Sequence, residues 1–413
     1  MPAIAMLSLF LISSATHAQA LPTISTGTVS LQQVLELVRR DNPEILAAHK
    51  RWEAAEKHIL QAATLDKPRL DLERMYVPTG NNAVPDTERA ISVTQDVPFP
   101  TKLYYRHGLA AKDAEISEQA YRAKLNGIIA RARTAYASLF LAERSLSIFD
   151  ENIDVMRRFA RVAESKVAAG RSHPSDALKA QVELTRMLNM QVALEGEKET
   201  SQATLNALMG RDASAMLATA KEPVTAALSA RFEDLESTAL SERPELREAS
   251  LASQRAGSSL SLARSDYLPD LMLQYRRRHD PQRGGTYDAI LGLSLPLWFW
   301  KPAAMVAEAQ ASRQAAQAEL QAETLATRAD VRTAWARART AGRLLEAYRT
   351  ALLPQAEESL KIAESGYRAD KSSFLDLLDA QRSLLNYQLE YYQNMAAYEQ
   401  RAADLARVVG REL

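Results

Sequence analysis

Apolar residues change their spacing along this chain in a regular order. A helix-forming segment comes first, with Asp41 or Asn42 as its cap and Pro43 in its first turn. Apolar residues then alternate with polar ones in two short segments, around 70–76 and 91–97. The turn-rich segment VPTGNNAVPDT separates these two segments, so the pair is predicted to be a β-hairpin.

A very long helix-forming stretch follows this hairpin. No proline occurs from Thr101 to His173, and a continuous helix over these residues would extend roughly 100 Å. A turn around Gly170 to Pro174 is expected to send the chain back along a second long helix, which ends at Gly210. Helices of this length are out of proportion to a compact domain and indicate an elongated hairpin.

The same succession of elements occurs twice in the chain. The segment NPEI, which starts at Asn42, matches RPEL, which starts at Arg243, and the register of about 200 residues holds to the ends of both halves. Other matched pairs are Pro68 with Pro269, Pro98 with Pro296, Arg133 with Arg332, Ala163 with Ala363, Leu205 with Leu405 and Gly210 with Gly410. We therefore predict two similar halves, 21–210 and 232–413, joined by a linking segment at 211–231.

The second half differs from the first at one point. Its strands are predicted around 271–275 and 287–295, with the turn DPQRGGT between them, and its far helical turn at 368–373. Pro354, however, falls inside its long helix and is predicted to break or kink the helix near Leu353.

Four strands of membrane length do not close on themselves, because outer-membrane barrels begin at about eight strands. Three chains supply twelve strands and leave an aqueous lumen, whereas eight strands are filled by side chains. The predicted fold class is therefore α+β. Long helical hairpins form a periplasmic tube, and four transmembrane strands per protomer join a shared twelve-stranded barrel in a homotrimer.

Composition narrows the functional classes. Apolar residues make up 46% of the 413 residues, and Lys+Arg equals Asp+Glu at 51 each, so charge indicates no nucleic-acid partner. The absence of cysteine excludes disulfides, thiolate metal sites and a lipid anchor on cysteine. Residues 1–20, with an apolar run and the cleavage pattern Ala18-Gln19-Ala20, are predicted to be a signal peptide. Beyond Ala20 no stretch is apolar for the roughly 18 to 20 residues of a transmembrane helix.

Four segments together resemble the TolC-type outer-membrane efflux proteins. They are ISVTQDVPFPTKLYYR (91–106), LGLSLPLWFWKPA (291–303), the long segment 352–392 and the leucine-to-glycine ends of the final helices. The stretch QDVPFPTKLYYR is similar to the CzcC-like heavy-metal branch. The resemblance covers essentially the whole mature chain. It implies an outer-membrane efflux channel, working with a periplasmic adaptor protein and an inner-membrane pump, favoured as the RND type, without cofactor or enzymatic activity.

The resemblance also implies a periplasmic gate. Asp376 and Asp379 match the aspartates that narrow the entrance of such channels, and Asp176 and Tyr367 match a pair that links neighbouring helices in the closed state. The alternative is helix capping, because Ser373 to Asp376 is a capping box and acids favour a helix N-terminus. The chain departs from the family pattern in two places, since Asp370 replaces a glycine and Ser372 replaces an arginine of the lock.

Two further surfaces are predicted. The helical tips, with Gly170, Arg171, Arg368 and Lys371, are expected to contact the adaptor. Aromatic residues lie where the strands give way to the helices, and they predict a belt at the membrane interface, with core aromatics as the alternative. The residues of this belt are Phe99, Tyr104, Tyr105, Trp298 and Trp300.

Other functional classes find less support in the sequence. The histidines show no paired ligand spacing, so no metal site is expected. Arg276, Arg277 and Arg278 end a strand near an outer loop and favour lipid headgroups or water over nucleic acid. No GxSxG, HExxH or Walker-type loop is present, which argues against an enzyme. A periplasmic coiled-coil adaptor or structural rod is the alternative from another class. Heavy-metal cations are the favoured cargo, and drugs or other organic molecules are the alternative.

Overall fold

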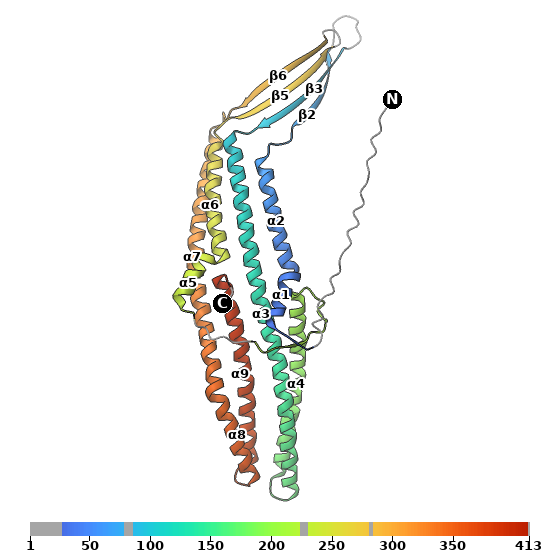
Figure 1. Cartoon of the computed structure of the whole chain (residues 1–413), viewed down its shortest axis with the longest axis vertical. Helices are drawn as coiled ribbons and strands as arrows, with labels where there is room; N and C mark the ends of the chain where they lie inside the picture. Colours follow the sequence, from blue (N-terminus) through green and yellow to red (C-terminus); the bar gives the residue numbers. More distant parts are fainter. Residues whose placement is uncertain (1–26, 78–85, 224–229, 281–283, 412–413) are drawn as a thin grey trace, which may run out of the picture.

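The computed structural model describes residues 27–77, 86–223, 230–280 and 284–411. The chain is elongated, with a β-sheet at one end and long helices running to the other (Figure 1). The predicted signal peptide at 1–20 lies outside the described residues, as does most of the turn predicted between the first two strands.

Helices dominate the described part of the chain, and the predicted long helices are confirmed. The helix α3 runs without interruption for 69 residues, because its sequence holds no proline after Pro100. The helical elements are α1 (Leu31–Asp41), α2 (Pro43–Ala63), α3 (Pro100–Ala168), α4 (Pro174–Leu208), α5 (Phe232–Glu242), α6 (Pro244–Ser265), α7 (Trp300–Ala347), a π-helical turn (Tyr348–Leu352), α8 (Leu353–Arg368) and α9 (Phe374–Val409).

The order of elements repeats along the chain. A short and a medium helix, two strands and two long helical arms occur in each half, and α2 and α6 both start with a proline. The predicted cap is Asn42, whose side-chain oxygen accepts the backbone amides of Glu44 and Ile45 at 2.9 and 3.1 Å. The short helices α1 and α5 were not predicted from the apolar pattern. Ser30 starts α1 with a capping box that includes Gln33.

The four predicted strands form one antiparallel sheet that joins the two halves. Its order is β2-β3-β5-β6, with β3 of the first half paired to β5 of the second, for example Val93 opposite Tyr275. The strands are β2 (Arg69–Val77), β3 (Asp86–Val97), β5 (Asp270–Asp280) and β6 (Gly284–Ser294). The outer edges of β2 and β6 pair with no other described strand.

A second, two-stranded sheet lies beside the middle of α3. Its strands, β1 (Thr28–Val29) and β4 (Thr219–Ala220), run parallel and are too short to show in any periodicity. The Tyr136 hydroxyl of α3 donates to this region. It lies 2.9 Å from the carbonyl oxygen of Val29 and 2.6 Å from that of Lys221. Burial raises the pKa of Tyr136 to about 12, so the hydroxyl keeps its proton.

The long helices pack as a wall in the order α4, α3, α9 and α8, since α3 contacts both α4 and α9, and α9 contacts α8. Met156, Met187 and Leu378 form part of one apolar core near the helical tips, with residues from α3, α4 and α9. A second core links α1, α3 and the end of α4 around Tyr136 and Leu205. No helix among the described residues is both long and apolar enough to cross a bilayer.

The helical arm is not interrupted at Pro354, where a break or kink was predicted. A five-residue π-helical turn, Tyr348–Leu352, precedes the proline, and α8 continues directly from Leu353. A wider turn accommodates the missing amide hydrogen and the ring of proline. The second arm is therefore continuous from Trp300 to Arg368, but it is not a uniform α-helix.

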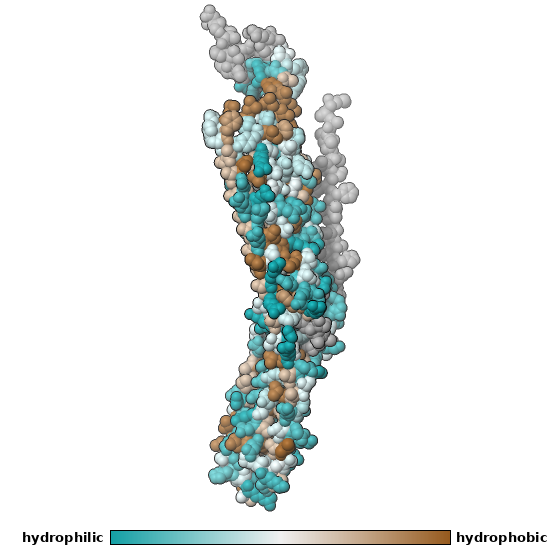
Figure 2. All heavy atoms as spheres, turned by 90° about the vertical axis from the view of Figure 1, so that its left-hand side faces the viewer, coloured by the Kyte–Doolittle hydropathy of each residue, from teal (hydrophilic) through white to brown (hydrophobic). Residues whose placement is uncertain are grey.

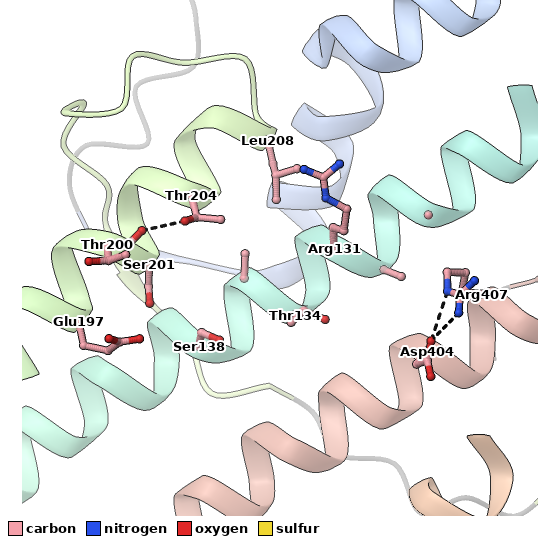
Figure 3. Close-up of a pocket in the computed structure, with 13 residues that line it drawn as sticks. Arg131, Thr134, Ser138, Glu197, Thr200, Ser201, Thr204, Leu208, Asp404 and Arg407 are labelled. Atoms are coloured by element: carbon pink, nitrogen blue, oxygen red, sulfur yellow. Dashed lines mark hydrogen bonds and ion pairs between the residues drawn. The ribbon is translucent and has the colours of Figure 1, made fainter. Parts of the chain in front are cut away.

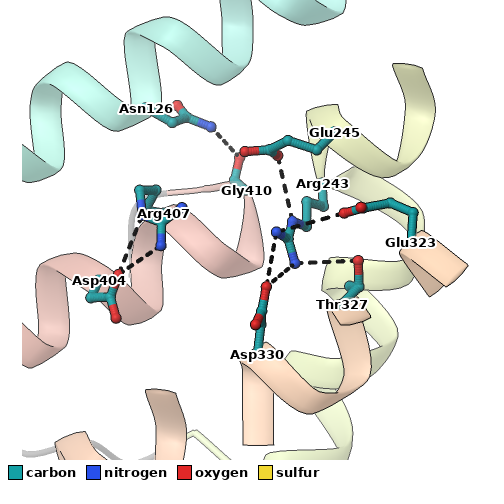
Figure 4. Close-up of polar contacts among 9 residues, drawn as sticks. All are labelled: Asn126, Arg243, Glu245, Glu323, Thr327, Asp330, Asp404, Arg407 and Gly410. Atoms are coloured by element: carbon teal, nitrogen blue, oxygen red, sulfur yellow. Dashed lines mark hydrogen bonds and ion pairs between the residues drawn. The ribbon is translucent and has the colours of Figure 1, made fainter. Parts of the chain in front are cut away.

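A buried arginine marks the junction of α5 and α6. The guanidinium of Arg243 lies 3.1 Å from the Asp330 carboxylate and 3.2 Å from the Thr327 hydroxyl of α7 (Figure 4). The carboxylates of Glu245 and Glu323 lie farther away, at 3.5 and 3.7 Å. Burial of such a cation is tolerated because carboxylates surround it.

The matching junction of the first half uses different chemistry. Asn42 stands at the position of Arg243, and its amide donates to the carbonyl of Leu208 at 2.7 Å. In each half the glycine after the last long helix, Gly210 or Gly410, has a positive φ and lies against this junction. The repeat thus keeps the backbone arrangement while the buried polar side chain changes.

Candidate channel surfaces

One face of the sheet is apolar and exposed, and the other is polar. Leu70 lies opposite Val93, which lies opposite Tyr275, and all three side chains are exposed. On the other face Ser92 is buried opposite Arg276, whose guanidinium lies 3.3 Å from Asp288. This polarity is the reverse of a water-soluble sheet and is typical of strands with a lipid-facing side. Figure 2 shows apolar side chains gathered toward the end of the molecule that carries the sheet.

The aromatic residues predicted at the membrane interface lie at the junction of sheet and helices. Tyr104 is 73% exposed, Trp298 65% and Trp300 68%, and the two tryptophan rings are 5.2 Å apart. Tyr105 packs edge-on against Tyr104 with ring centroids 5.4 Å apart. Phe99 is half-buried as the residue before α3. The strand-to-helix boundary thus carries two pairs of rings, Tyr104 with Tyr105 and Trp298 with Trp300.

The two helical tips turn in the same way. Gly170 and Asp370 both have a positive φ, of 68° and 58°. The amides of Arg171 and Lys371 each donate 2.8 Å to a carbonyl five residues earlier, in the manner of a helix that ends in a left-handed residue. The aspartate that replaces the family glycine therefore leaves the turn geometry unchanged. Arg171, Arg368 and Lys371 are all exposed at these tips.

A lysine that the sequence did not single out joins the two tips. Lys166, near the end of α3, donates to the Tyr367 carbonyl and to the Asp370 carboxylate, the latter at 2.5 Å. Its ammonium group also lies 4.2 Å from the centre of the Tyr367 ring. The hydrogen bond from Lys166 is the main cause of the lowered pKa of Asp370. Lys166 thus connects the first helical hairpin to the second.

The predicted pair of Asp176 and Tyr367 is close in space but not directly bonded. Tyr367 is buried against Phe374, and its hydroxyl lies near Ser172 and makes no direct hydrogen bond to Asp176. Asp176 instead accepts a hydrogen bond of 2.6 Å from the Ser172 hydroxyl. Burial raises the pKa of Tyr367, Ser172 and Lys166 oppose this shift, and the negative charge of Asp176 adds to it.

Asp376 and Asp379 lie on one exposed face at the start of α9. The carboxylate of Asp376 accepts from the Ser373 amide and hydroxyl at 2.9 and 2.8 Å, so the predicted capping box is present. These hydrogen bonds lower the pKa of Asp376 and keep it ionised. Asp379 forms no hydrogen bond or ion pair within the described structure, so capping does not explain its charge.

An ion pair with one buried partner, Glu183, lies beside these acids. Glu183 of α4 accepts a hydrogen bond of 2.5 Å from the guanidinium of Arg382, which follows Asp379 by one turn of α9. Sequence reasoning missed this pair because 199 residues separate its members. One signal was present: Glu183 lies between Ala180 and Met187 in the apolar stripe of α4, where only a partnered charge is tolerated.

One pocket lies away from all of these residues. It has a volume of about 500 Å³ between α3, α4 and the end of α9, and hydroxyl groups of Thr134, Ser138 and Thr204 line it (Figure 3). Its arginines are already engaged: Arg131 with Glu44 and Arg407 with Asp404. Across the described residues, no group of three or more His, Asp or Glu side chains is arranged to hold a metal ion.

Known proteins resemble the chain over nearly its whole length. The cobalt-zinc-cadmium resistance protein CzcC of Cupriavidus metallidurans is 24% identical over 396 residues, which cover 94% of this chain and 92% of that protein. The crystal structure of a membrane protein from Pseudomonas aeruginosa superposes with a TM-score of 0.81 at 18% identity, covering 92% of this chain and 90% of that one. Crystal structures of CusC give 0.80 at 17% identity, covering 92% of both chains.

The family comparison covers both halves of the repeat. The model described as outer membrane efflux protein matches residues 34–211 and again residues 235–411. These matches take in the helical wall, the sheet and the tips described above. The chain therefore belongs to the outer membrane efflux protein family, as an outer-membrane channel protein rather than an enzyme, with its helices in the periplasm.

Proposed function

We propose that three copies of this chain form a passive conduit that carries heavy-metal cations out of the cell. An inner-membrane pump, of the RND type, supplies the energy, and a periplasmic adaptor joins pump and channel. The observation that carries the proposal is the reversed polarity of a sheet whose two edges are open. The similarity to a cobalt-zinc-cadmium resistance protein over 94% of the chain supports the choice of cargo.

The sheet argues for assembly. The unpaired edges of β2 and β6 expose backbone hydrogen-bonding groups, which lipid does not satisfy. Pairing β6 of one copy with β2 of the next removes these edges and keeps the apolar face outward. Three copies give twelve strands and a lumen lined by the polar face that carries Ser92, Arg276 and Asp288.

The helical wall also has two open sides. The helix α4 exposes Leu178, Val182 and Val192, and at the other side α8 exposes Ile362. Leu178 and Ile362 lie at similar distances from the tips, near the start of α4 and the end of α8. Contact between α4 of one copy and α8 of the next would bury these side chains and close a helical tube.

The tips and the acids at the start of α9 take the remaining roles. Gly170, Arg171, Arg368 and Lys371 lie at the far end of both hairpins and form the adaptor contact. Asp376 and Asp379 face the axis of the tube, where threefold symmetry turns each into a ring of carboxylates. Such rings attract cations to a constriction. The cations pass these rings as cargo.

Two experiments test the assembly and the cargo. Native mass measurement of the detergent-extracted protein is expected to give three copies, and a stable monomer or dimer would contradict the proposal. The chain is then returned to a host lacking it, together with its own pump and adaptor. Tolerance to zinc, cobalt and cadmium is expected to rise. Restored tolerance to organic compounds alone, with no change for the metals, would assign the cargo to the organic class.

A further inference from the structure

We infer that Glu183 is a specificity-determining residue, which keeps the constriction negative by holding Arg382 away from Asp379. The inference rests on the proposed function, because it takes Asp379 to face the path of the ions. Glu183 itself touches no ion. It acts through the position of one guanidinium.

Helix geometry places Arg382 within reach of Asp379. Side chains three residues apart on a helix are neighbours, and each leans toward the helix N-terminus, so Arg382 leans back toward the turn of Asp379. An acid followed three residues later by a base is a favourable pair on a helix surface. Without a competing partner, the Arg382 guanidinium is therefore expected to neutralise the Asp379 carboxylate.

The structure shows the competing partner. The Glu183 side chain is 4% exposed, and its carboxylate lies 2.5 Å from the Arg382 guanidinium. A buried carboxylate holds such a cation more firmly than an exposed one, because water screens it less. Arg186 is the other cation near Glu183, but it is 3.9 Å away and its side chain is 69% exposed. Arg382 is thus the principal partner of Glu183.

Asp379 is left unpaired but within the electrostatic range of Arg382. The Glu183 hydrogen bond is the main cause that raises the pKa of Arg382, and Asp379 contributes through charge alone. The described structure gives Asp379 no hydrogen bond or ion pair of its own. Each copy therefore presents the Asp379 charge without a counterion, although an arginine lies one helical turn away.

Ion selectivity of purified trimers in planar bilayers tests this inference. Reversal potentials under a KCl gradient are compared for the wild type, Glu183→Gln, Arg382→Gln, the double variant and Asp379→Asn. Glu183→Gln frees Arg382 and is expected to lower the cation-to-anion permeability ratio by about twofold, the combined effect on cation and anion of one unit charge at about 8 Å in water after screening by the salt. Arg382→Gln is expected to leave the ratio unchanged or raise it. In the double variant the ratio is expected to return to at least the wild-type value.

Because Glu183→Gln and Arg382→Gln change the net charge in opposite directions, Glu183→Gln is also made in the Asp379→Asn background. An effect of the same size there would show that Glu183 does not act through Asp379, and would overturn the inference. If Glu183→Gln does not assemble, the double variant is decisive. A permeability ratio of the double variant below the wild-type value would overturn the inference. Unchanged selectivity in Asp379→Asn would refute the proposed constriction itself. A response of Asp379→Asn without a response of Glu183→Gln would refute only the role of Glu183.

Discussion

At the scale of single residues, Asp370 combines a backbone and a side-chain role. Its φ of 58° is a conformation that glycine adopts freely and that aspartate and asparagine tolerate better than most residues. Its carboxylate meanwhile binds Lys166 of the other hairpin. The aspartate therefore replaces the family glycine without a change of turn and adds a contact between the tips.

Replacement of Asp370 is expected to loosen the second tip in two steps. Asp370→Asn keeps a residue suited to the left-handed backbone but loses the ion pair with Lys166. Asp370→Ala loses the ion pair and adds backbone strain, which should speed local opening about fivefold beyond the asparagine variant. Hydrogen exchange of the amides at 366–373 measures both steps. Equal exchange rates in the two variants would show that the backbone contributes nothing.

Glu399 gives a pH-dependent prediction. Burial between α9 and α3 raises the pKa of this carboxyl, although Arg133 at 3.3 Å opposes the shift. Between the unfolded and the folded pKa, the folded chain holds a proton that the unfolded chain releases, so wild-type stability falls as the pH rises through this range. Glu399→Gln lacks this loss and is expected to gain stability relative to the wild type from pH 4 to pH 7. Thermal unfolding of both proteins across that range measures the stability of Glu399→Gln minus that of the wild type. A fall of this difference with rising pH would contradict the prediction.

Sequence alone predicted local chemistry at this scale and missed contacts between distant segments. The capping box of Ser373 and Asp376 follows from their spacing, because both partners lie in the first turn of one helix. The contacts of Lys166 with Asp370, and of Glu183 with Arg382, join residues about 200 positions apart. Their positions depend on how the hairpins pack, which no local pattern contains.

At the scale of elements, the glycines that end the long helices differ in what surrounds them. Gly210 has a φ of 69°, and a Cβ atom there would lie 2.5 Å from the Asp41 carbonyl oxygen. Gly170 has nearly the same φ, 68°, but nothing lies within 4 Å of the same point. A side chain at Gly170 would therefore meet backbone strain alone, whereas one at Gly210 would meet the same strain and a close neighbouring element.

Alanine at these two glycines is expected to have unequal effects. Gly170→Ala should cost about 1 kcal/mol, which is the strain of a left-handed alanine. Gly210→Ala adds a clash between the end of α4 and the junction of α1 and α2, and should cost about 2 to 4 kcal/mol. Chemical denaturation of both variants provides the measurement. Equal losses would mean that the α1–α2 junction yields freely to the new methyl group.

The strands and long helices were predictable because each extends over enough residues to show its period. The strands β1 and β4 have two residues each, below the length at which alternation appears. Pro354 is incompatible with a regular α-helix, as predicted. A π-helical turn is found there in place of a break. The packing of α7 and α8 against α9 holds the arm continuous despite the proline.

At the scale of the whole molecule, the proposed trimer depends on the open sides of the helical wall. In Figure 1, α4 and α8 lie on opposite sides of the end that carries the tips. Arginine at both Leu178 and Val182 would place charges within the contact between copies, and is expected to reduce the trimer fraction at least tenfold. Met216→Arg is the control, because Met216 is equally apolar and exposed but lies outside the helical wall. Native mass spectra of both variants measure the trimer fraction. Intact trimers in the double variant would show that α4 does not form the contact between copies at these residues.

The interlocking of the two halves has a consequence for how the chain is made. Strand β3 pairs with β5, and one core holds Val29 near the start of the described chain together with Met395 of α9. Contacts between such distant residues slow folding, because a long loop must close before they form. The first half cannot complete its core while the second is still being synthesised and exported. Until α9 arrives, the apolar surface of the first half stays open to other chains, so we expect the chain to need protection during its passage through the periplasm.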